Sequence, residues 1–213
     1  MAVKVITPIK RRPELTRVQF RDYYETRHAP LGTRYFPFEK YVRNHLIEAD
    51  PADPGYDCLM EGWLDREKAL ALLDGNVGAI FAEDEAKFMV TRGIGVDVEE
   101  RIVAGPPRSV DPRGLRKEVL VLAGAADIAR TWAQDLARTA GAGCLRLVLD
   151  EVLPGQEAMG FPGDAILTAW PAGNRTVLRG ARPPEGIAIK ASLLVESEET
   201  TPEELKAAFG KRP

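Results

Sequence analysis

The sequence predicts an α+β protein built from two successive halves of similar element order. Between residues 3 and 103, strand-like and helix-like stretches follow one another in the order β-α-β-β-α-β. After a segment rich in proline and glycine, a similar order begins again. With 213 residues and 45% hydrophobic content, the chain is long and apolar enough to form a proper core.

The first strand and the first helix have clear local patterns. Residues 3–10 (VKVITPIK) are rich in β-branched side chains, which favours a strand that ends near its proline. Thr16 and Gln19 have the spacing of a capping box, which predicts a helix start. We expect this helix to run from Arg17 to His28 and to stop there, because Pro30 disfavours helical geometry in the residue before it.

The remainder of the first half predicts a hairpin, a helical region and a last strand. The turn-rich sequence DPADPG separates the two hairpin strands. The predicted elements are strands at 39–49 and 56–65, a helical region at 66–89 broken around Gly75, and a strand at 93–103. The resulting order β-α-β-β-α-β is the ferredoxin-like arrangement.

The second half resembles a degenerate copy of the first. Residues 105–114 lack an apolar period and predict a linker between a unit at 1–104 and a unit at 115–213. The predicted elements are strands at 115–125, 143–154, 164–172 and 186–197, a helix at 127–141 and a C-terminal helical tail at 201–209. The second helix of the repeat is missing or shortened, so the repeat rests mainly on strand order.

Charge argues against nucleic acid and membrane partners. Acidic and basic residues nearly cancel, 32 against 29, with 18 against 15 up to Ala104 and 14 of each after it. Neither half therefore concentrates positive charge as nucleic-acid or anionic-membrane binding requires. No apolar run approaches the roughly 18 residues of a membrane helix, and the N-terminus lacks the pattern of a secretion signal. We expect a cytoplasmic protein with a small-molecule partner.

The sequence also lacks the usual motifs of metal and cofactor sites. Cys58 and Cys144 lie far apart and fit no metal or redox spacing, so we expect reduced packing residues. There is no glycine-rich phosphate loop after a strand, no nucleophile elbow and no ligand-spaced histidine pair. We therefore expect a site without cofactor or metal.

Four segments carry a family resemblance. They are LTRVQFRDYYETRHAPLG (15–32), YVRNHLIEA (41–49), YDCLMEGWLD (56–65) and EDEAKF (83–88). In order and spacing they resemble the EthD-type branch of the dimeric α+β barrel proteins. The resemblance implies that two ferredoxin-like units pair sheet against sheet into an α+β barrel, here as an internal pseudo-dimer. Because relatives dimerise readily, the sequence leaves a homodimer open.

The resemblance implies a range of activities and no single reaction. Members and cousins of the superfamily include cofactor-free cyclases, dehydratases, decarboxylases and oxygenases that act on aromatic and polyketide-like molecules, while others have no established chemistry. The fold alone therefore cannot decide the function.

Candidate residues on the first helix lie around His28. Helical periodicity groups Tyr23, Tyr24, Arg27 and His28 with Phe20 on one broad face, whereas Asp22 and Glu25 point elsewhere. In one interpretation His28 points into the barrel mouth as a general acid or base. In the other it caps the last carbonyls of the helix.

Candidate residues on the hairpin include the second histidine. Strand alternation places Arg43 and His45 on one face, which we expect to line the barrel because buried charge needs partners. On the next strand Glu61 and Trp63 share a face, and Glu61 either orients His45 or forms a structural ion pair at a sheet edge. Trp63 is either core or pocket wall. The resemblance implies that Asp84 neighbours the site, whereas acidic helix residues are usually solvated, so we expect no direct role for it.

These observations lead to one functional hypothesis and two alternatives. We expect one mainly apolar, aromatic pocket in the first half, in a cofactor-independent lyase or cyclase acting on an aromatic or polyketide-like carbonyl compound. His28 is the predicted acid or base, and His45 is a second polar contact or proton carrier. Arg43 or Arg27 is the predicted group that stabilises an enolate. The predicted walls of the pocket are Tyr23, Tyr24 and Trp63. The alternatives are a ligand-binding or stress-associated protein without turnover and a cofactor-free oxygenase.

Overall fold

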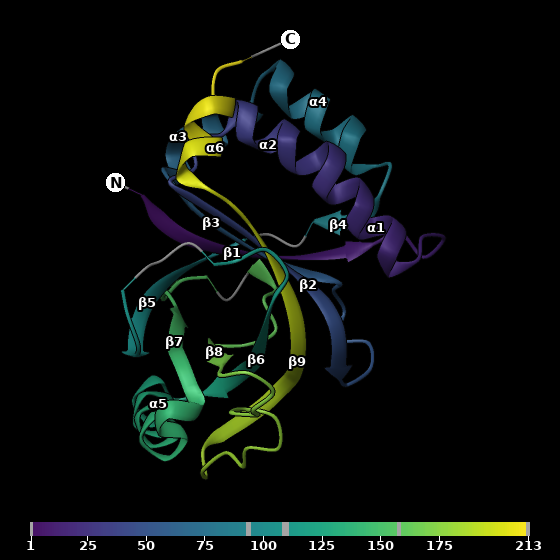
Figure 1. Ribbon diagram of the computed structural model, residues 1–213. Coiled ribbons are helices and arrows are strands. Elements are labelled where there is room, and N and C mark those ends of the chain that lie inside the picture. Colours follow the sequence, from purple (N-terminus) through teal and green to yellow (C-terminus); the bar gives the residue numbers. More distant parts are fainter. Residues whose placement is uncertain (1, 93–94, 108–110, 157–158, 212–213) are drawn as a thin grey trace.

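A closed β-barrel forms the centre of the computed structural model, which describes residues 2–92, 95–107, 111–156 and 159–211 (Figure 1). The strands are β1 (Val3–Arg11), β2 (Lys40–Asp50), β3 (Cys58–Leu64), β4 (Met89–Arg92), β5 (Val96–Ala104), β6 (Leu115–Gly124), β7 (Cys144–Val152), β8 (Ala165–Pro171) and β9 (Ile187–Thr200). Their order is β3-β2-β9-β6-β8-β7-β5-β1-β4, and β3 also pairs with β1. Eight strands therefore close an antiparallel barrel, and the short β4 extends it from β1.

The two halves of the chain contribute strands in the same relative order. The first half contributes β5-β1-β3-β2 and the second contributes β9-β6-β8-β7. The halves meet at two seams, one between β2 and β9 and one between β5 and β7. Each half thus leaves two sheet edges that only the other half covers.

The helices cover the outer face of the barrel. They are α1 (Arg17–Tyr23), the π-helix η1 (Tyr24–His28), α2 (Ala29–Tyr35), α3 (Arg66–Leu73), α4 (Asn76–Glu85), α5 (Ala126–Ala140), the 3-10 turn η2 (Gly141–Gly143) and α6 (Pro202–Ala208). In Figure 1 those of the first half lie together above the sheet, while α5 packs on the second half. The C-terminal α6 crosses back to α2, where the Gly210 amide donates to the Arg34 carbonyl.

Most predicted elements are present close to their expected bounds. The capping box of Thr16 and Gln19 forms, and the β2–β3 hairpin is antiparallel. The predicted helical region 66–89 is broken between Leu73 and Asn76, as the glycine there indicated. No helix joins β8 to β9, all of whose connection is described. Residues 93–94 of the predicted strand 93–103 and residues 108–110 of the predicted linker lie outside the described residues.

The first helix does not end at His28, contrary to the sequence expectation. The chain passes from α1 through the π-helical turn η1 directly into α2 and stays helical to Tyr35. Pro30 is accommodated because it falls in the first turn of α2, where its missing N–H leaves little unsatisfied. His28 therefore lies within a long helical run, and the helix-capping interpretation of its side chain is wrong.

The barrel interior is filled by side chains. Apolar residues from both halves pack there, including Ile6, Leu59 and Val119. Charged side chains lie between them, and the interior cavity lined by Asn44 and Asp150 has a volume of only about 10 Å³. Among the described residues, the side chains around this cavity therefore leave no room for a ligand inside the barrel.

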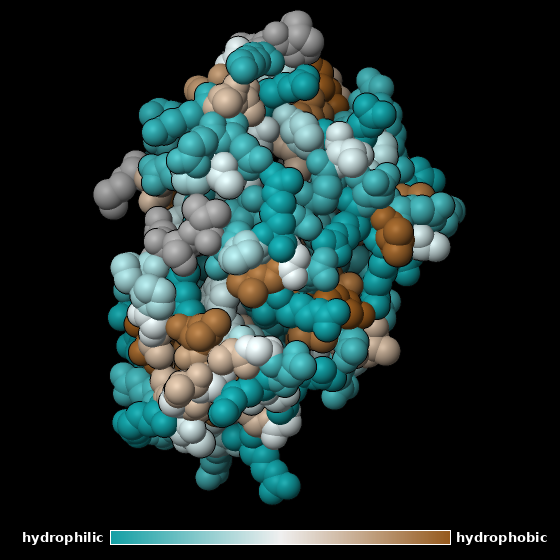
Figure 2. All heavy atoms as spheres, viewed as in Figure 1, coloured by the Kyte–Doolittle hydropathy of each residue, from teal (hydrophilic) through white to brown (hydrophobic). Residues whose placement is uncertain are grey.

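Hydrophilic side chains cover most of the face shown in Figure 2, and apolar ones form small separate groups. Among the described residues, no helix is both long and apolar enough to cross a bilayer.

Candidate functional site

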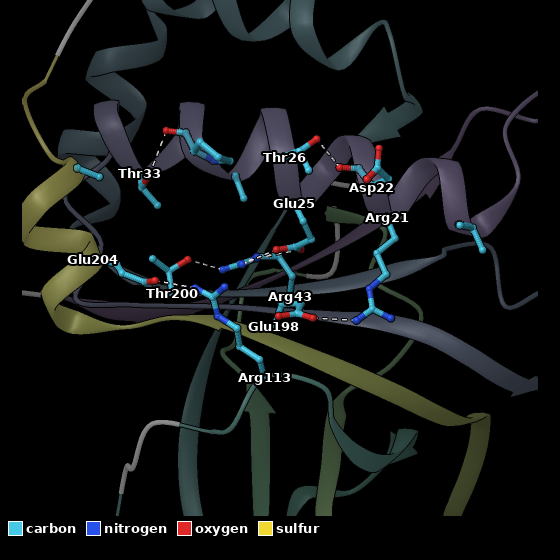
Figure 3. Close-up of a pocket in the computed structure, with 14 residues that line it drawn as sticks. Arg21, Asp22, Glu25, Thr26, Thr33, Arg43, Arg113, Glu198, Thr200 and Glu204 are labelled. Atoms are coloured by element: carbon cyan, nitrogen blue, oxygen red, sulfur yellow. Dashed lines mark hydrogen bonds and ion pairs between the residues drawn. The ribbon is translucent and has the colours of Figure 1, made fainter.

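A cleft of about 730 Å³ lies outside the barrel, between the first helical run and the seam of β2 with β9 (Figure 3). Its lining includes Val18, Arg21, Asp22, Glu25, Thr26, Ala29, Pro30 and Thr33 from the helical run, Arg43 from β2, Glu198 and Thr200 from β9, and Arg113, Glu204 and Ala208. The second half of the chain therefore supplies one wall. Ten of these fourteen residues are polar or charged, although the larger part of the surface they expose to the cleft is apolar; contrary to expectation, none of the fourteen is aromatic.

Glu25 joins the helix to strand β2 on the floor of this cleft. Its Oε1 lies 2.6 Å from Nε2 of His45 and accepts a hydrogen bond from Arg43 Nε at 3.2 Å. Its Oε2 accepts from Arg43 Nη2 at 2.6 Å. Burial by itself would raise the pKa of Glu25, but hydrogen bonds from His45 and Arg43 lower that pKa to about 2. Glu25 is therefore an ionised carboxylate that faces the cleft at neutral pH.

The π-helical turn explains why Glu25 and His28 face different neighbours. A π turn closes with an i→i+5 bond, here from the Ala29 amide to the Tyr24 carbonyl, and so places more residues in one turn than an α-helix. Glu25 then reaches β2 while His28 reaches α4. Because π turns occur often at functional sites, the segment Tyr24–His28 is a candidate in its own right.

His45 lies directly behind Glu25 and is 4% exposed. Its ring packs against the rings of Phe20 and Tyr24, with centroid separations of 6.2 and 5.6 Å. Its Nδ1 atom is buried without a hydrogen-bond partner among the described residues. A ligand in the cleft therefore meets His45 through the carboxylate of Glu25 and not directly.

Arg43 has its orientation fixed by contacts on three sides. Besides Glu25, its Nη1 donates to the Tyr41 carbonyl at 3.2 Å and to the Thr200 hydroxyl at 2.7 Å. The guanidinium also lies 4.6 Å from the centre of the Tyr41 ring, a cation–π distance. Since Thr200 belongs to β9, the second half of the chain helps to orient this arginine.

A second histidine–carboxylate pair lies on the other side of η1. His28 Nδ1 is 2.8 Å from Asp84 Oδ2, and the Tyr23 hydroxyl donates to Asp84 Oδ1 at 2.8 Å. Burial by itself would raise the pKa of Asp84, but the hydrogen bonds from His28 and Tyr23 lower it. The Phe88 ring packs on both His28 and Tyr23. This pair fastens the helical run to α4 and does not line the cleft.

Residues 12–92 match the EthD domain family. The first half of the chain therefore carries an EthD domain. No curated protein matches the chain.

The fold of the whole chain is shared with solved structures. One is a proposed monooxygenase from Lactobacillus acidophilus, with 11% identity, a TM-score of 0.52 and coverage of 94% of this chain and 96% of that one. Another is a proposed monooxygenase from Fusobacterium nucleatum, with 9% identity, a TM-score of 0.54 and coverage of 93% and 94%. At these identities the likeness shows the fold alone. The mixed α+β barrel of this chain is therefore a known architecture.

Within the EthD domain, the hairpin faces are opposite to the sequence expectation. Arg43 and His45 do share a face of β2, but that face packs under the helices. The inner face carries Asn44, and Glu61 from β3 lies on the same inner side. A helical carboxylate, Glu25, satisfies the buried charges of the outer face, and the sequence pattern did not assign it that role.

Glu61 and Trp63 belong to the barrel interior and not to the cleft. Glu61 accepts from Asn44 Nδ2 at 2.6 Å and pairs with Lys4 at 2.8 Å. Its expected pairing with Arg43 or His45 is wrong, because the register places Val42 opposite Glu61 and puts Arg43 on the other face. Trp63 lies under the Lys4 ammonium, 4.7 Å from the ring centre.

The three remaining predicted site residues, Tyr23, Tyr24 and Arg27, differ in how deeply they are buried, and none of them lines the cleft. Tyr24 is 1% exposed, packs between the two histidine rings and accepts a hydrogen bond from the Tyr41 hydroxyl at 3.4 Å. Tyr23 is half-buried against Asp84 and Phe88. Arg27 is exposed and does not line the cleft, because the π turn alters the phase of the helix after Tyr23.

Sequence reasoning missed several cleft residues. Glu198 and Thr200 lie in the second half, more than 150 residues from Arg43. Arg21 was missed although it donates to Glu198 at 2.8 Å and also contacts Glu196. Alternation along β9 could have placed Glu196, Glu198 and Thr200 on one face, but only the barrel topology brings that face beside β2. Among the described residues, no histidine, cysteine and carboxylate cluster has a metal-binding arrangement.

Proposed function

We propose that the chain is an enzyme that acts on a small hydroxylated carbonyl compound, of polyketide-like chemistry, by proton transfer in the cleft of the EthD domain. The observation that carries the proposal is Glu25, an ionised carboxylate on the cleft floor that is held by His45 and Arg43. The polar lining favours a substrate with several hydroxyl groups over a purely apolar aromatic one.

The arrangement supports a dehydratase-type elimination. The proton between His45 Nε2 and Glu25 passes to the leaving hydroxyl of the substrate while the His45 ring keeps a proton on Nδ1, and the C–O bond breaks as water departs. Solvent restores the transferred proton after each turnover. The exposed carboxylate of Asp22, in the same cleft, takes a proton from the carbon next to the one that loses the hydroxyl. The electron pair of the broken C–H bond forms the new double bond. Arg43 steadies negative charge on the carbonyl oxygen. These steps need no cofactor.

His28 has a positioning role in this proposal. It is not part of the cleft lining, and its Nδ1 is committed to Asp84. By fastening η1 to α4 it fixes the turn from which Glu25 reaches the floor of the cleft. The earlier expectation of His28 as acid or base stays a prediction that the experiment below also tests.

We infer that the barrel is an internal pseudo-dimer of ferredoxin-like units at 1–104 and 115–213, joined by the linker 105–114. The shared strand order supports this inference. So does a repeated pair of side chains inside the barrel: Lys4 lies 4.7 Å from the Trp63 ring centre, and Lys117 lies 4.8 Å from that of Trp170. The second unit has no matching cleft in this proposal, because the corresponding outer face packs Leu147 and Leu149 against α5.

Two other functions remain distinct candidates. A cofactor-free oxygenase is favoured by the fold shared with two proposed monooxygenases. A binding protein without turnover is favoured by the burial of both histidines, which leaves no imidazole on the cleft surface.

The deciding experiment incubates the protein with a panel of hydroxylated aromatic and polyketide-like ketones, with and without oxygen, and follows each compound by mass spectrometry. Elimination predicts a product lighter by one water in both conditions. Glu25→Gln and His45→Asn should abolish its formation, while the exposed Arg27→Ala serves as the matched control and should retain it. His28→Ala should lower the rate without abolishing it.

Other results of this experiment would contradict the elimination. A product that forms only when oxygen is present, and that is heavier than the substrate by the mass of incorporated oxygen, indicates the oxygenase. Saturable binding of an unchanged compound indicates the binding protein. Complete loss of activity in a folded His28→Ala variant would return the acid–base role to His28.

A further inference from the structure

A buried cluster inside the barrel holds more carboxylates than cations. The Lys4 ammonium lies 2.7 Å from Asp150, 2.8 Å from Glu61 and 3.3 Å from Glu100. All four side chains are almost fully buried; the most accessible, Glu61, is 11% exposed. Glu61 also interacts with the Lys117 ammonium, whereas Asp150 shares its only contacting cation in the described part of the chain, Lys4, with the other two carboxylates. A buried negative charge that is only partly balanced is costly unless it is neutralised.

No other cation contacts Asp150 among the described residues. The charged groups that face it are Lys4 from β1, Glu61 from β3 and Glu100 from β5, which is directly opposite Asp150 in the β5–β7 register. The lysine on β6, Lys117, forms an ion pair with Asp111 at 2.9 Å and donates a hydrogen bond to Asn44 Oδ1 at 3.3 Å. Strands β2 and β8 present Asn44 and Thr168 toward the same space, and neither titrates.

The hydrogen bonds show where a neutralising proton fits. Both oxygens of Glu61 are bonded, Oε1 by Asn44 at 2.6 Å and Oε2 by Lys4 at 2.8 Å. Asp150 uses Oδ2 for Lys4, but its Oδ1 has no hydrogen-bond partner among the described residues. Asp150 also lines the interior cavity of about 10 Å³, which is close to the minimum volume that holds one water.

We propose that Asp150 is a proton-binding site, which carries a proton on Oδ1 in mildly acidic solution and holds it inside the closed barrel beside the seam of β5 with β7. The protonated carboxyl still accepts from Lys4 at Oδ2 and donates from Oδ1 into the cavity, toward Thr168 or a water. A metal cation is a poor alternative, because half of the cavity lining is apolar and too few oxygens converge there.

The electrostatics support this site. Burial raises the pKa of Asp150 to about 7; Lys4 opposes the increase, and Glu61 and Glu100 add to it. The unfolded chain has the ordinary, lower pKa. The folded state therefore binds a proton that the unfolded state releases, and stability from this site is present at low pH and lost as pH rises toward 7.

Infrared difference spectroscopy of the full chain, with aspartate labelled by ¹³C at the side-chain carboxyl, tests the site directly. We expect the carbonyl band of a buried protonated carboxyl at pH 6, shifted by the label, and its loss at pH 9. Asp150→Asn should remove the band. Asp127→Asn, which removes an exposed aspartate, is the matched control and should retain it.

Equilibrium unfolding in urea gives the second readout. Because the folded wild type holds one more proton than the unfolded chain, its unfolding equilibrium constant should rise about tenfold per pH unit between pH 5 and 6, relative to Asp150→Asn. If Asp150→Asn does not fold, the ¹³C carboxyl shifts of the wild type still report the titration. A wild type without the band at pH 6, or a band that survives Asp150→Asn or disappears in Asp127→Asn, would overturn the proposal.

Discussion

The carboxylate of Glu25 joins three elements of the site and should contribute strongly to stability. Its pKa of about 2 lies below the ordinary value of 4.5, which corresponds to about 3 kcal/mol of stabilisation at neutral pH. Because the folded pKa is lowered, this contribution is present above pH 4.5 and is lost as pH falls through 2. We therefore expect Glu25→Gln to lower the free energy of unfolding by about this amount at pH 7 and by much less at pH 3.

Urea unfolding of both proteins between pH 3 and 8 measures this difference. Asp22→Asn is the control, because that carboxylate lies on the same helical run but is exposed. Equal pH profiles for wild type and Glu25→Gln would show that Glu25 is not held by His45 and Arg43 in solution.

At the same residue scale, the sequence selected residues that lie in or behind the cleft, but it did not predict the contacts that these residues make. Both histidines and Arg43 were predicted, and they do lie next to Tyr24 or Glu25. Glu25 was predicted to point away from the shared helix face because the prediction assumed a regular α-helical period. A single π turn invalidates that assumption, and no residue pattern in the segment indicates such a turn. The partner of a buried charged side chain likewise depends on which strands and helices pack together, and the alternation of residues along a strand does not specify that packing.

At the scale of elements, strands and hairpins were easier to predict than the long helical run. A period of two and turn residues such as DPADPG define strands locally, so β2 and β3 appear near their expected bounds. Pro30 gives the same local pattern whether it ends a helix or starts a new turn of one, so the continuation to Tyr35 was missed. Strand β4 has only four residues, too few for a periodic pattern.

The C-terminal α6 should depend on one side chain for its position over the cleft. Leu205 is its only buried residue and belongs to the hydrophobic cluster that also contains Phe20 and Phe88. We expect Leu205→Ala to release α6 at a cost of about 2–5 kcal/mol, or the smaller free energy of docking if the helix detaches without further unfolding. Hydrogen exchange at the Gly210 amide, which bonds to Arg34, measures the release.

The exposed Lys206→Ala substitution in the same helix is the control and should leave that exchange rate unchanged. Protection of the Gly210 amide in Leu205→Ala equal to that in the wild type would contradict the assigned role of Leu205. Because Glu204 and Ala208 line the cleft, release of α6 should also open it to larger ligands.

At the scale of the whole molecule, the two halves complete each other. Strands β2 and β5 are the edge strands of the first half, and their outer edges are hydrogen-bonded only because β9 pairs with β2 and β7 pairs with β5. Element order predicted each half from the sequence, but the seams followed only from the family resemblance, since nothing local in β9 specifies β2 as its neighbour. The inward charges of the barrel were unpredictable for the same reason, because Lys4 and Asp150 lie 146 residues apart.

Separate expression of the halves tests this interdependence. Residues 1–104 alone present two uncovered sheet edges and a buried Lys4 without Asp150, so we expect this fragment to self-associate or aggregate and not to persist as a folded monomer. Residues 105–213 alone should behave in the same way. Co-expressed, the fragments should form a one-to-one complex, because each supplies the missing strand at both seams. Light scattering after size-exclusion chromatography measures the assembly. A stable, monomeric 1–104 fragment with the near-ultraviolet circular dichroism of the whole chain would contradict the requirement for a second half, since Thr200 and α6 would then be dispensable for the ordered site.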